Sequence, residues 1–281
     1  ASDGTVRREH QAGVVQIARS VDRVPADRPI VFSSGAVTHW NPWSATAFRL
    51  TAPLSYTATR WFDARSSFIF PQGQTDLTLI NAALDDQPAP LDNRLIEDLF
   101  PIAKPISTTS EVYSATQLSS SLDTRLITLT QANVSWPGEV QIAQAAQLPV
   151  LFSDQLELIG YDLRRTAIPI GRNIRLTTYW RAQQPLGTQP TSIFVHMLDK
   201  DGNLAAQWDG FTIAPEYVQA GDIIVQVHFI PISPDFNAGE YQLALGRYYP
   251  KVPNQPRLSI ELDGQLVADR VLLQPVSIVP P

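Results

Sequence analysis

The residues with the clearest potential for chemistry are three oxygen ligands spaced two apart. Asp199, Asp201 and Asn203 alternate as the ligands of a calcium loop do. The third acidic position and the distal glutamate of an EF-hand loop are missing, and Asp201-Gly202 lies between two apolar runs, as a tight hairpin turn does. We therefore expect a turn here and no metal ion.

Two histidines and a serine pair raise further possibilities. His196 and His228 each fall in a predicted strand and could face outward on neighbouring strands, but no third ligand stands at a readable spacing. Residues 33–35, Ser-Ser-Gly, follow an apolar run without the glycine spacing of a nucleophile elbow or a P-loop. The sequence therefore predicts neither a metal site nor a catalytic residue, and it implies no cofactor.

Aromatic side chains are the better candidates for ligand binding. Trp208, Tyr217, Tyr248 and Tyr249 fall at the ends of predicted strands or in loops, where flat rings could stack on sugars. The alternative is packing in the core or at the rim, because half-buried aromatic residues are expected in sheets. We name these four as the predicted ligand-binding residues.

The composition is that of a folded, mildly acidic protein. Of 281 residues, 44% are hydrophobic and 17% are charged, which argues against disorder. The formal net charge of -6 offers no basic patch, which argues against nucleic acid as a partner. The absence of cysteine excludes disulfides, thiolate catalysis and most structural zinc sites.

We also expect the chain to be part of a longer protein. Its one methionine is Met197, so it does not begin at an initiator. No run approaches the ~18 to 20 apolar residues that span a bilayer, so any membrane part of the gene product would lie outside this sequence.

The first hundred residues mix helix and strand signals, which indicates a small α/β layer domain over residues 1–105. A connecting segment with weak strand signals follows at 106–149. The predicted helices span 6–21, 42–50 and 91–100, and the predicted strands span 30–32, 57–62, 67–70 and 76–80.

The pattern changes beyond Pro149, where apolar and polar residues alternate between turn residues. This predicts an antiparallel β-sandwich of immunoglobulin-like or jelly-roll type over 150–281, and so an α+β chain of two domains. The predicted strands span 156–163, 174–180, 192–198, 204–208, 223–230, 241–248, 258–261 and 271–276.

A series of short motifs carries a family resemblance. In order, they are Arg-Trp-Phe-Asp-Ala-Arg at 60–65, Phe-Ile-Phe-Pro at 68–71, the stretch 152–161, Tyr-Trp-Arg-Ala at 179–182, Phe-Val-His-Met-Leu-Asp at 194–199 with Asp201-Gly202, Gly-Glu-Tyr-Gln-Leu at 239–243, and Arg257-Leu258. Together they resemble the soluble C-terminal region of bacterial family 39 glycosyltransferases, relatives of protein O-mannosyltransferases. The likeness covers most of the chain and is strongest from Leu148 onward. The chain departs from the pattern at Gln226, where an acidic residue is expected, and at 246–249, where Gly-Arg-Tyr-Tyr replaces Gly-Leu-Tyr-Asp.

The resemblance implies a function that the residues alone do not give. It implies a non-catalytic, extracytoplasmic accessory region of a polytopic enzyme that transfers sugar from a polyprenyl-phosphate donor. Its partners would be the transmembrane part of the same polypeptide and a glycan or protein acceptor. The catalytic acidic residues of such enzymes match no position here. The alternatives are a secreted or surface-attached carbohydrate-binding or adhesion protein, and a hydrolase whose site one sequence does not reveal.

Overall fold

The computed structural model of the chain is mostly β, with several sheets consistent with a β-sandwich. Its described residues are 15, 18–19, 29–33, 50–52, 59–82, 93–105, 113–120, 122, 133–136, 144–153, 155–262 and 265–281. In this part of the chain, no helix is both long enough and apolar enough for a membrane span.

The chain divides into two compact units, and one of them is discontinuous in sequence. Unit 1 comprises Ala1–Asp123 and Thr212–Ile223, and unit 2 comprises Thr124–Phe211 and Ile224–Pro281. The boundaries expected from the sequence were 105 and 149. A short segment from the middle of the C-terminal half thus belongs to unit 1.

Unit 1 contains a mixed sheet with the strand order β2-β1-β4-β6-β5. The central strand β1 pairs in parallel with β2 and β4, whereas β6 runs antiparallel to β4 and β5. Parallel strands covered on both faces are continuous apolar runs, which explains Ile-Val-Phe at 30–32. The strands are β1 (Ile30–Ser33), β2 (Arg60–Phe62), β4 (Asp76–Ala82), β5 (Ile102–Pro105) and β6 (Tyr113–Ser119), with β3 (Ser67–Phe70) outside this sheet.

The helix predicted over 91–100 is confirmed as α5 (Asn93–Leu99). Its buried residues Leu95 and Leu99 are four apart, and therefore lie on one face of the helix. Most of the predicted helices over 6–21 and 42–50 lies outside the described residues, so the α/β layer arrangement stays a prediction. The core of unit 1 is aromatic: the Phe68 ring lies 5.0 Å from that of Phe70 and 4.7 Å from that of Phe100.

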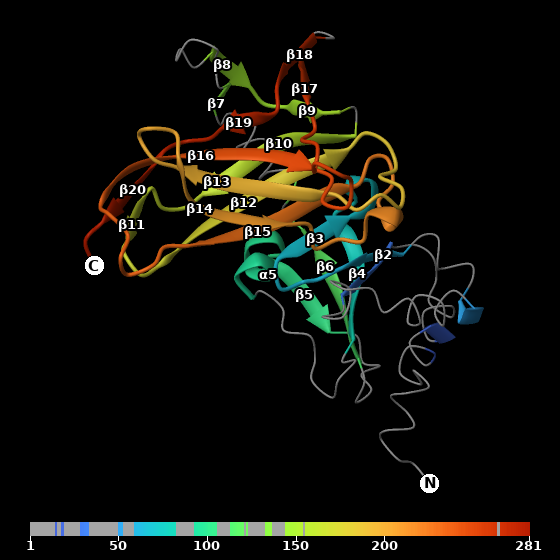
Figure 1. Cartoon of the computed structure of the whole chain (residues 1–281). Helices are drawn as coiled ribbons and strands as arrows, with labels where there is room; N and C mark the ends of the chain where they lie inside the picture. Colours follow the sequence, from blue (N-terminus) through green and yellow to red (C-terminus); the bar gives the residue numbers. More distant parts are fainter. Residues whose placement is uncertain are drawn as a thin grey trace. The chain divides into compact units, whose positions relative to one another are not determined.

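Unit 2 contains two sets of hydrogen-bonded strands. The first has the order β18-β17-β9-β10-β12-β15, and the second has β11-β20-β16-β19-β7-β8, with β13 joined to β16 and β14 joined to β13. In Figure 1 the long strands of unit 2, such as β12, β13 and β16, run roughly along one direction. Both sets contribute buried side chains, which is consistent with a β-sandwich.

The C-terminal strand predictions are largely confirmed, with boundary shifts of one to two residues. The strands of unit 2 are β7 (Asn133–Trp136), β8 (Gln144–Gln147), β9 (Val150–Phe152), β10 (Leu156–Leu163), β11 (Ala167–Pro169), β12 (Asn173–Ala182), β13 (Ser192–Leu198), β14 (Leu204–Gly210), β15 (Ile223–Pro231), β16 (Gly239–Tyr248), β17 (Ile260–Leu262), β18 (Gln265–Ala268), β19 (Arg270–Leu272) and β20 (Val276–Val279).

The single strand predicted over 271–276 is wrong. The chain forms two short strands there, β19 and β20, which are separated by residues 273–275. Pro275 lies in that break and has no N–H to donate to a sheet ladder, which explains why one continuous strand does not form.

Candidate functional site

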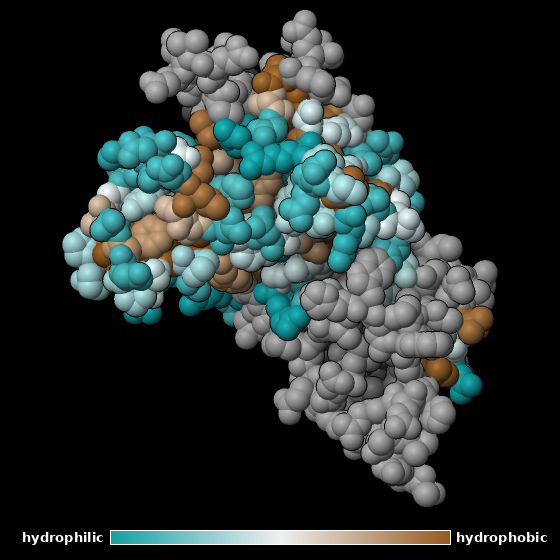
Figure 2. Space-filling model, viewed as in Figure 1, coloured by the Kyte–Doolittle hydropathy of each residue, from teal (hydrophilic) through white to brown (hydrophobic). Residues whose placement is uncertain are grey.

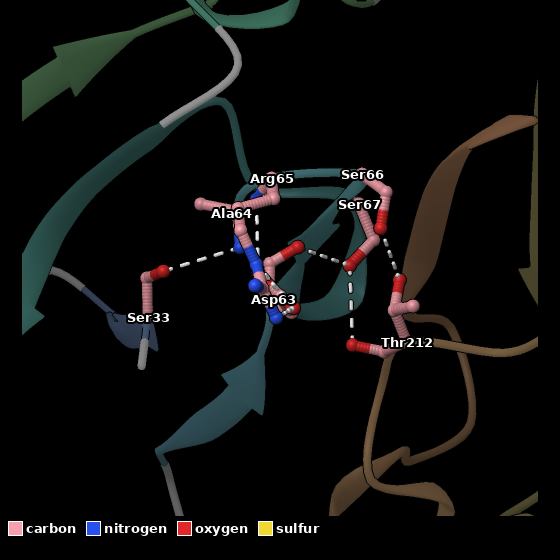
Figure 3. Close-up of polar contacts among 7 residues, drawn as sticks. All are labelled: Ser33, Asp63, Ala64, Arg65, Ser66, Ser67 and Thr212. Atoms are coloured by element: carbon pink, nitrogen blue, oxygen red, sulfur yellow. Dashed lines mark hydrogen bonds and ion pairs between the residues drawn. The ribbon is translucent and has the colours of Figure 1, made fainter. Parts of the chain in front are cut away.

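The Arg-Trp-Phe-Asp-Ala-Arg motif forms a buried polar turn in unit 1 (Figure 3). The carboxylate of Asp63 accepts hydrogen bonds from the backbone N–H of Arg65 at 3.0 Å and from the Arg65 guanidinium. The carbonyl oxygen of Asp63 accepts the N–H of Ser66 and both the N–H and the hydroxyl of Ser67. The carboxylate of Asp63 thus pairs with Arg65, and its carbonyl oxygen closes the turn.

The same turn holds the segment Thr212–Ile223, which belongs to unit 1. Thr212 accepts the N–H of Asp63 at its carbonyl oxygen, 3.0 Å away, and its hydroxyl contacts that of Ser66 at the same distance (Figure 3). On the other side of the turn, the N–H of Ala64 donates to the hydroxyl of Ser33 at 3.2 Å. The motif that carries part of the family resemblance is therefore a structural element.

A buried ion pair holds the C-terminal end of the segment Thr212–Ile223. Asp222 is fully buried, and its carboxylate lies 2.6 Å from Nε of Arg60. It also accepts the backbone N–H groups of Gln72 and Gln219, both at 2.9 Å. Four donors around one carboxylate satisfy its lone pairs, which is the condition under which a buried charge is tolerated.

Of the four predicted aromatic residues, one belongs to unit 1 and three belong to unit 2. Tyr217 belongs to unit 1, where its ring lies 6.0 Å from that of Trp61. Trp208 points into unit 2, where its ring meets the edge of the His228 ring at 4.5 Å. Tyr248 and Tyr249 are consecutive, so they differ in direction: Tyr248 lies 6.3 Å from Phe194, and Tyr249 donates to Gln155 at 3.2 Å. Ligand binding by these residues stays a prediction.

The turn at 199–203 is confirmed. Gly202 has a φ of 81°, and its N–H donates to the carbonyl oxygen of Asp199. The carboxylate of Asp199 accepts the N–H groups of Asp201 and Asn203 at 2.9 and 2.8 Å, and these bonds lower the pKa of Asp199. In the described part of the chain, no group of three metal-ligating side chains occurs.

The prediction that both histidines could face outward is wrong for His228, which is fully buried. Its Nε2 lies 2.7 Å from the hydroxyl of Thr178, which also accepts the indole N–H of Trp180. Desolvation lowers the pKa of His228 to about 3. The residues of β15 from Ile223 to His228 are all buried, so the alternation of polar and apolar residues there does not mark an exposed face.

His196, by contrast, belongs to a polar and aromatic cluster on the outer side of the second sheet. Strand β13 turns Ile193, Val195 and Met197 into the core, which places Phe194 and His196 on the opposite side. We call this cluster the Phe194 face. It comprises Phe194, His196, Asp209, Tyr248, Arg257, Asp269 and Arg270.

Strand register brings the cluster together. Phe194 on β13 is opposite Asp209 on β14 and Gly246 on β16, and Gly246 is in turn opposite Arg270 on β19. A Cβ atom at position 246 would lie 2.3 Å from Cζ of Phe194, so the phenyl ring needs glycine beneath it. Strands β13, β14, β16 and β19 therefore supply one continuous row of side chains.

The charged groups of the Phe194 face are arranged around the phenyl ring. The Arg257 guanidinium lies 4.7 Å above the ring centroid, within cation–π distance, and its Nη1 lies 2.8 Å from the Asp269 carboxylate. Asp269 also accepts from Nη1 of Arg270 at 3.1 Å. The His196 ring lies 4.5 Å from the Phe194 ring. Figure 2 shows hydrophilic side chains gathered over β16 on the visible side of unit 2.

Two titratable groups of this face have shifted pKa values. Burial, with help from the charges of Arg257 and Arg270, lowers the pKa of His196, so its imidazole is neutral at pH 7. Desolvation raises the pKa of Asp209, and the nearby Arg257 opposes that rise. The face thus offers carboxylate acceptors, guanidinium donors and a neutral imidazole beside aromatic rings. Such a set can bind a ligand that has both hydroxyl groups and an apolar surface.

Part of this face is predictable from the sequence. Phe194 and His196 are two residues apart in a predicted strand, so they are expected on the same face of it. Tyr248 is one of the predicted site residues. Asp209, Arg257 and Arg270 were missed, because they come from three other parts of the chain and only strand pairing brings them together.

Comparisons with known proteins identify no family. No family model and no curated protein matches the chain. Among solved structures, the C-terminal domain of Wzt is similar, with 12% identity, a TM-score of 0.33, and coverage of 47% of this chain and 78% of that one. The CARDB domain of the PF1109 protein from Pyrococcus furiosus, solved with di-metal ions, is also similar, with 12% identity, a TM-score of 0.24, and coverage of 47% and 96%. Likenesses this weak assign neither family nor function.

Proposed function

We propose that this chain is a non-catalytic, glycan-binding region, and that the Phe194 face binds the glycan. The observation that supports this most is the position of Arg257, Asp269 and His196 around one aromatic ring on the outer side of a sheet. Sugars present hydroxyl groups in a plane and C–H groups on their faces. Carboxylates and guanidinium groups bind the hydroxyl groups, and aromatic rings bind the C–H faces.

Arg257 is the side chain that covers the ring of Phe194. Its side chain is 38% exposed, whereas Phe194 is 2% exposed and lies beneath it. An arginine that swings away would uncover the phenyl ring for a sugar while remaining near enough to donate to its hydroxyl groups. Tyr248 then supplies the second ring at the edge of the same surface.

A calorimetric titration of the purified chain with defined glycans tests this proposal. We expect weak binding, with Kd in the millimolar to micromolar range, which corresponds to about -4 to -8 kcal/mol. Because Tyr248 and Asp209 each supply one contact, Tyr248→Ala and Asp209→Asn should each weaken binding by about tenfold, the effect of ~1.4 kcal/mol.

Arg257→Ala should also weaken glycan binding, and Arg181→Ala is its matched control. Arg181 is also an exposed arginine paired with a carboxylate, that of Glu157 at 3.1 Å, but it lies on β12 in the other sheet. The control should bind as the wild type does. Equal loss of affinity in Arg181→Ala and Arg257→Ala, or no glycan binding at all, would contradict the proposal.

We further propose that the glycan-binding region is extracytoplasmic and serves a polytopic glycosyltransferase that uses a polyprenyl-phosphate donor. The resemblance of the motifs from 60 to 258 to family 39 enzymes supports this. In that setting unit 1 would be an α/β layer, unit 2 a sandwich of immunoglobulin-like or jelly-roll type, and the transmembrane part of the same polypeptide the partner. The region would position a glycan or protein acceptor.

The non-catalytic part of this proposal has its own test. In unit 1, the carboxylates of Asp63 and Asp222 are each paired with an arginine and accept backbone N–H groups, as structural carboxylates do. We predict that the chain neither transfers sugar from lipid-linked donors nor hydrolyses chromogenic glycosides. Robust turnover that disappears when one carboxylate is changed to its amide would instead establish a hydrolase or transferase.

A further inference from the structure

A buried arginine lies at one end of unit 2, apart from the Phe194 face. Arg247 follows Gly246 on β16, so its side chain points to the inner side of the sheet. It is fully buried. Its Nη2 donates to the hydroxyl of Thr191 at 3.1 Å and its Nη1 reaches the carbonyl oxygen of Phe152 at 3.5 Å, but its Nε is buried and makes no hydrogen bond.

Within the described part of the chain, the charge of Arg247 is not balanced by a neighbouring carboxylate. Among the described residues, no Asp or Glu forms an ion pair with it. Desolvation lowers the pKa of Arg247 to about 10, so the guanidinium stays protonated at neutral pH. A buried charge with only two neutral acceptors is costly, and an apolar side chain would avoid that cost.

We propose that Arg247 binds an oxyanion, the carboxylate or phosphate group of a ligand that enters at this end of unit 2. The fork of the guanidinium suits two oxygens of one such group, and the unused Nε–H is available for one of them. Thr191 lies beside it, and its hydroxyl now donates to the carbonyl oxygen of Tyr248 at 3.5 Å, a long bond that an anion could replace.

In this proposal, Tyr249 and Gln155 would form the entrance to the site. Both are half-buried and therefore reach solvent, and the Tyr249 hydroxyl donates to Oε1 of Gln155 at 3.2 Å. Tyr249 also lies close enough to Arg247 to affect its pKa electrostatically. Separation of this hydrogen-bonded pair would open a path to the guanidinium and free the tyrosine hydroxyl as a further donor. This site is independent of the proposed glycan site.

The competing account is an internal counter-ion. Asp154, which is outside the described residues, stands between Ser153 and Gln155 in the sequence. If its carboxylate paired with Arg247, the two would stabilise each other and no external anion would be required. Arg247→Leu and Asp154→Asn, alone and combined, separate the two accounts.

The experiment measures the melting temperature of the full chain in chloride, inorganic phosphate or glucuronate at matched ionic strength, with glucose as the neutral analogue of glucuronate. For the wild type we expect a saturable rise with phosphate, glucuronate or both, and none with glucose. A rise with only one of them identifies the source of the oxyanion. For Arg247→Leu we expect no saturable rise, and in chloride a melting temperature at or above that of the wild type. Arg181→Leu, which removes an exposed arginine, should keep the response.

Two results would overturn the proposal. One is an equal response to the anions in the wild type and Arg247→Leu, which would be a general salt effect. The other is destabilisation by Arg247→Leu and Asp154→Asn that is not additive, which would establish the internal ion pair. If Arg247→Leu fails to fold, the Nε–H resonance of Arg247 in the wild type, assigned by its absence from Arg247→Lys, gives the answer. It should shift on titration with the anion, and a resonance that stays unchanged at saturation would refute the site.

Discussion

At single positions of this chain, the burial of polar residues is what the sequence predicts least well. His228 alternates with Val225 and Val227, so its pattern is that of a half-buried strand. In the structure all three are fully buried, and Thr178 satisfies Nε2 of the histidine. The pattern identified the strand correctly. It did not identify the exposed face, because a hydrogen bond to a residue on another strand is invisible in sequence.

The buried His228 makes stability depend on pH. Its pKa in the folded chain, about 3, is below the unfolded value of 6.5, so the folded state resists protonation. The stabilisation is complete above pH 6.5 and is lost as the pH falls from 6.5 towards 3, at up to about 1.4 kcal/mol per pH unit. His196, whose pKa is also lowered, adds to the same trend.

Urea unfolding at pH 7.5, 6 and 5 measures this effect. His228→Gln should flatten the dependence of unfolding free energy on pH, although the variant is less stable at pH 7.5. His196→Gln is the control and should retain most of the slope. A slope that is the same in the wild type and His228→Gln would mean that another group controls it.

At the scale of elements, the strands were predictable and their partners were not. Strands β10 and β13 match the predicted ranges 156–163 and 192–198 to the residue, because alternation and flanking turns define them locally. The role of Thr212–Ile223 had no such local signal. Arg60 and Asp222 are 162 positions apart, and nothing in either local sequence indicates their ion pair.

Loss of that ion pair should destabilise unit 1 strongly. Asp222→Ala leaves the Arg60 guanidinium, whose side chain is 6% exposed, without its carboxylate. We expect a loss of about 3 to 5 kcal/mol in unfolding free energy, the usual consequence of leaving one partner of a buried pair. Chemical denaturation checks this. Asp201→Ala, which removes an exposed carboxylate, should change stability by less than about 0.5 kcal/mol. Equal effects would contradict a structural role for Asp222.

At the scale of the whole molecule, the compact units are not contiguous along the chain. Composition and linkers suggest boundaries between consecutive segments, whereas unit 1 includes Thr212–Ile223 from the C-terminal half. The Phe194 face also combines residues that are distant in sequence, since Phe194, Asp209 and Arg270 come from three strands. Sequence motifs predicted the β-rich class, and long-range pairing created the candidate site.

The central claim is that the Phe194 face binds a glycan, and chemical-shift mapping of the isotope-labelled chain tests it most directly. On titration with a binding glycan, we predict that the largest amide shifts fall on β13, β14, β16 and β19, around Phe194, Asp209 and Arg270. Trp208, on the inner side of β14, should respond less than Asp209. Shifts centred on Trp208 and His228, or spread over β10 and β12 with the Phe194 face unchanged, would contradict the account.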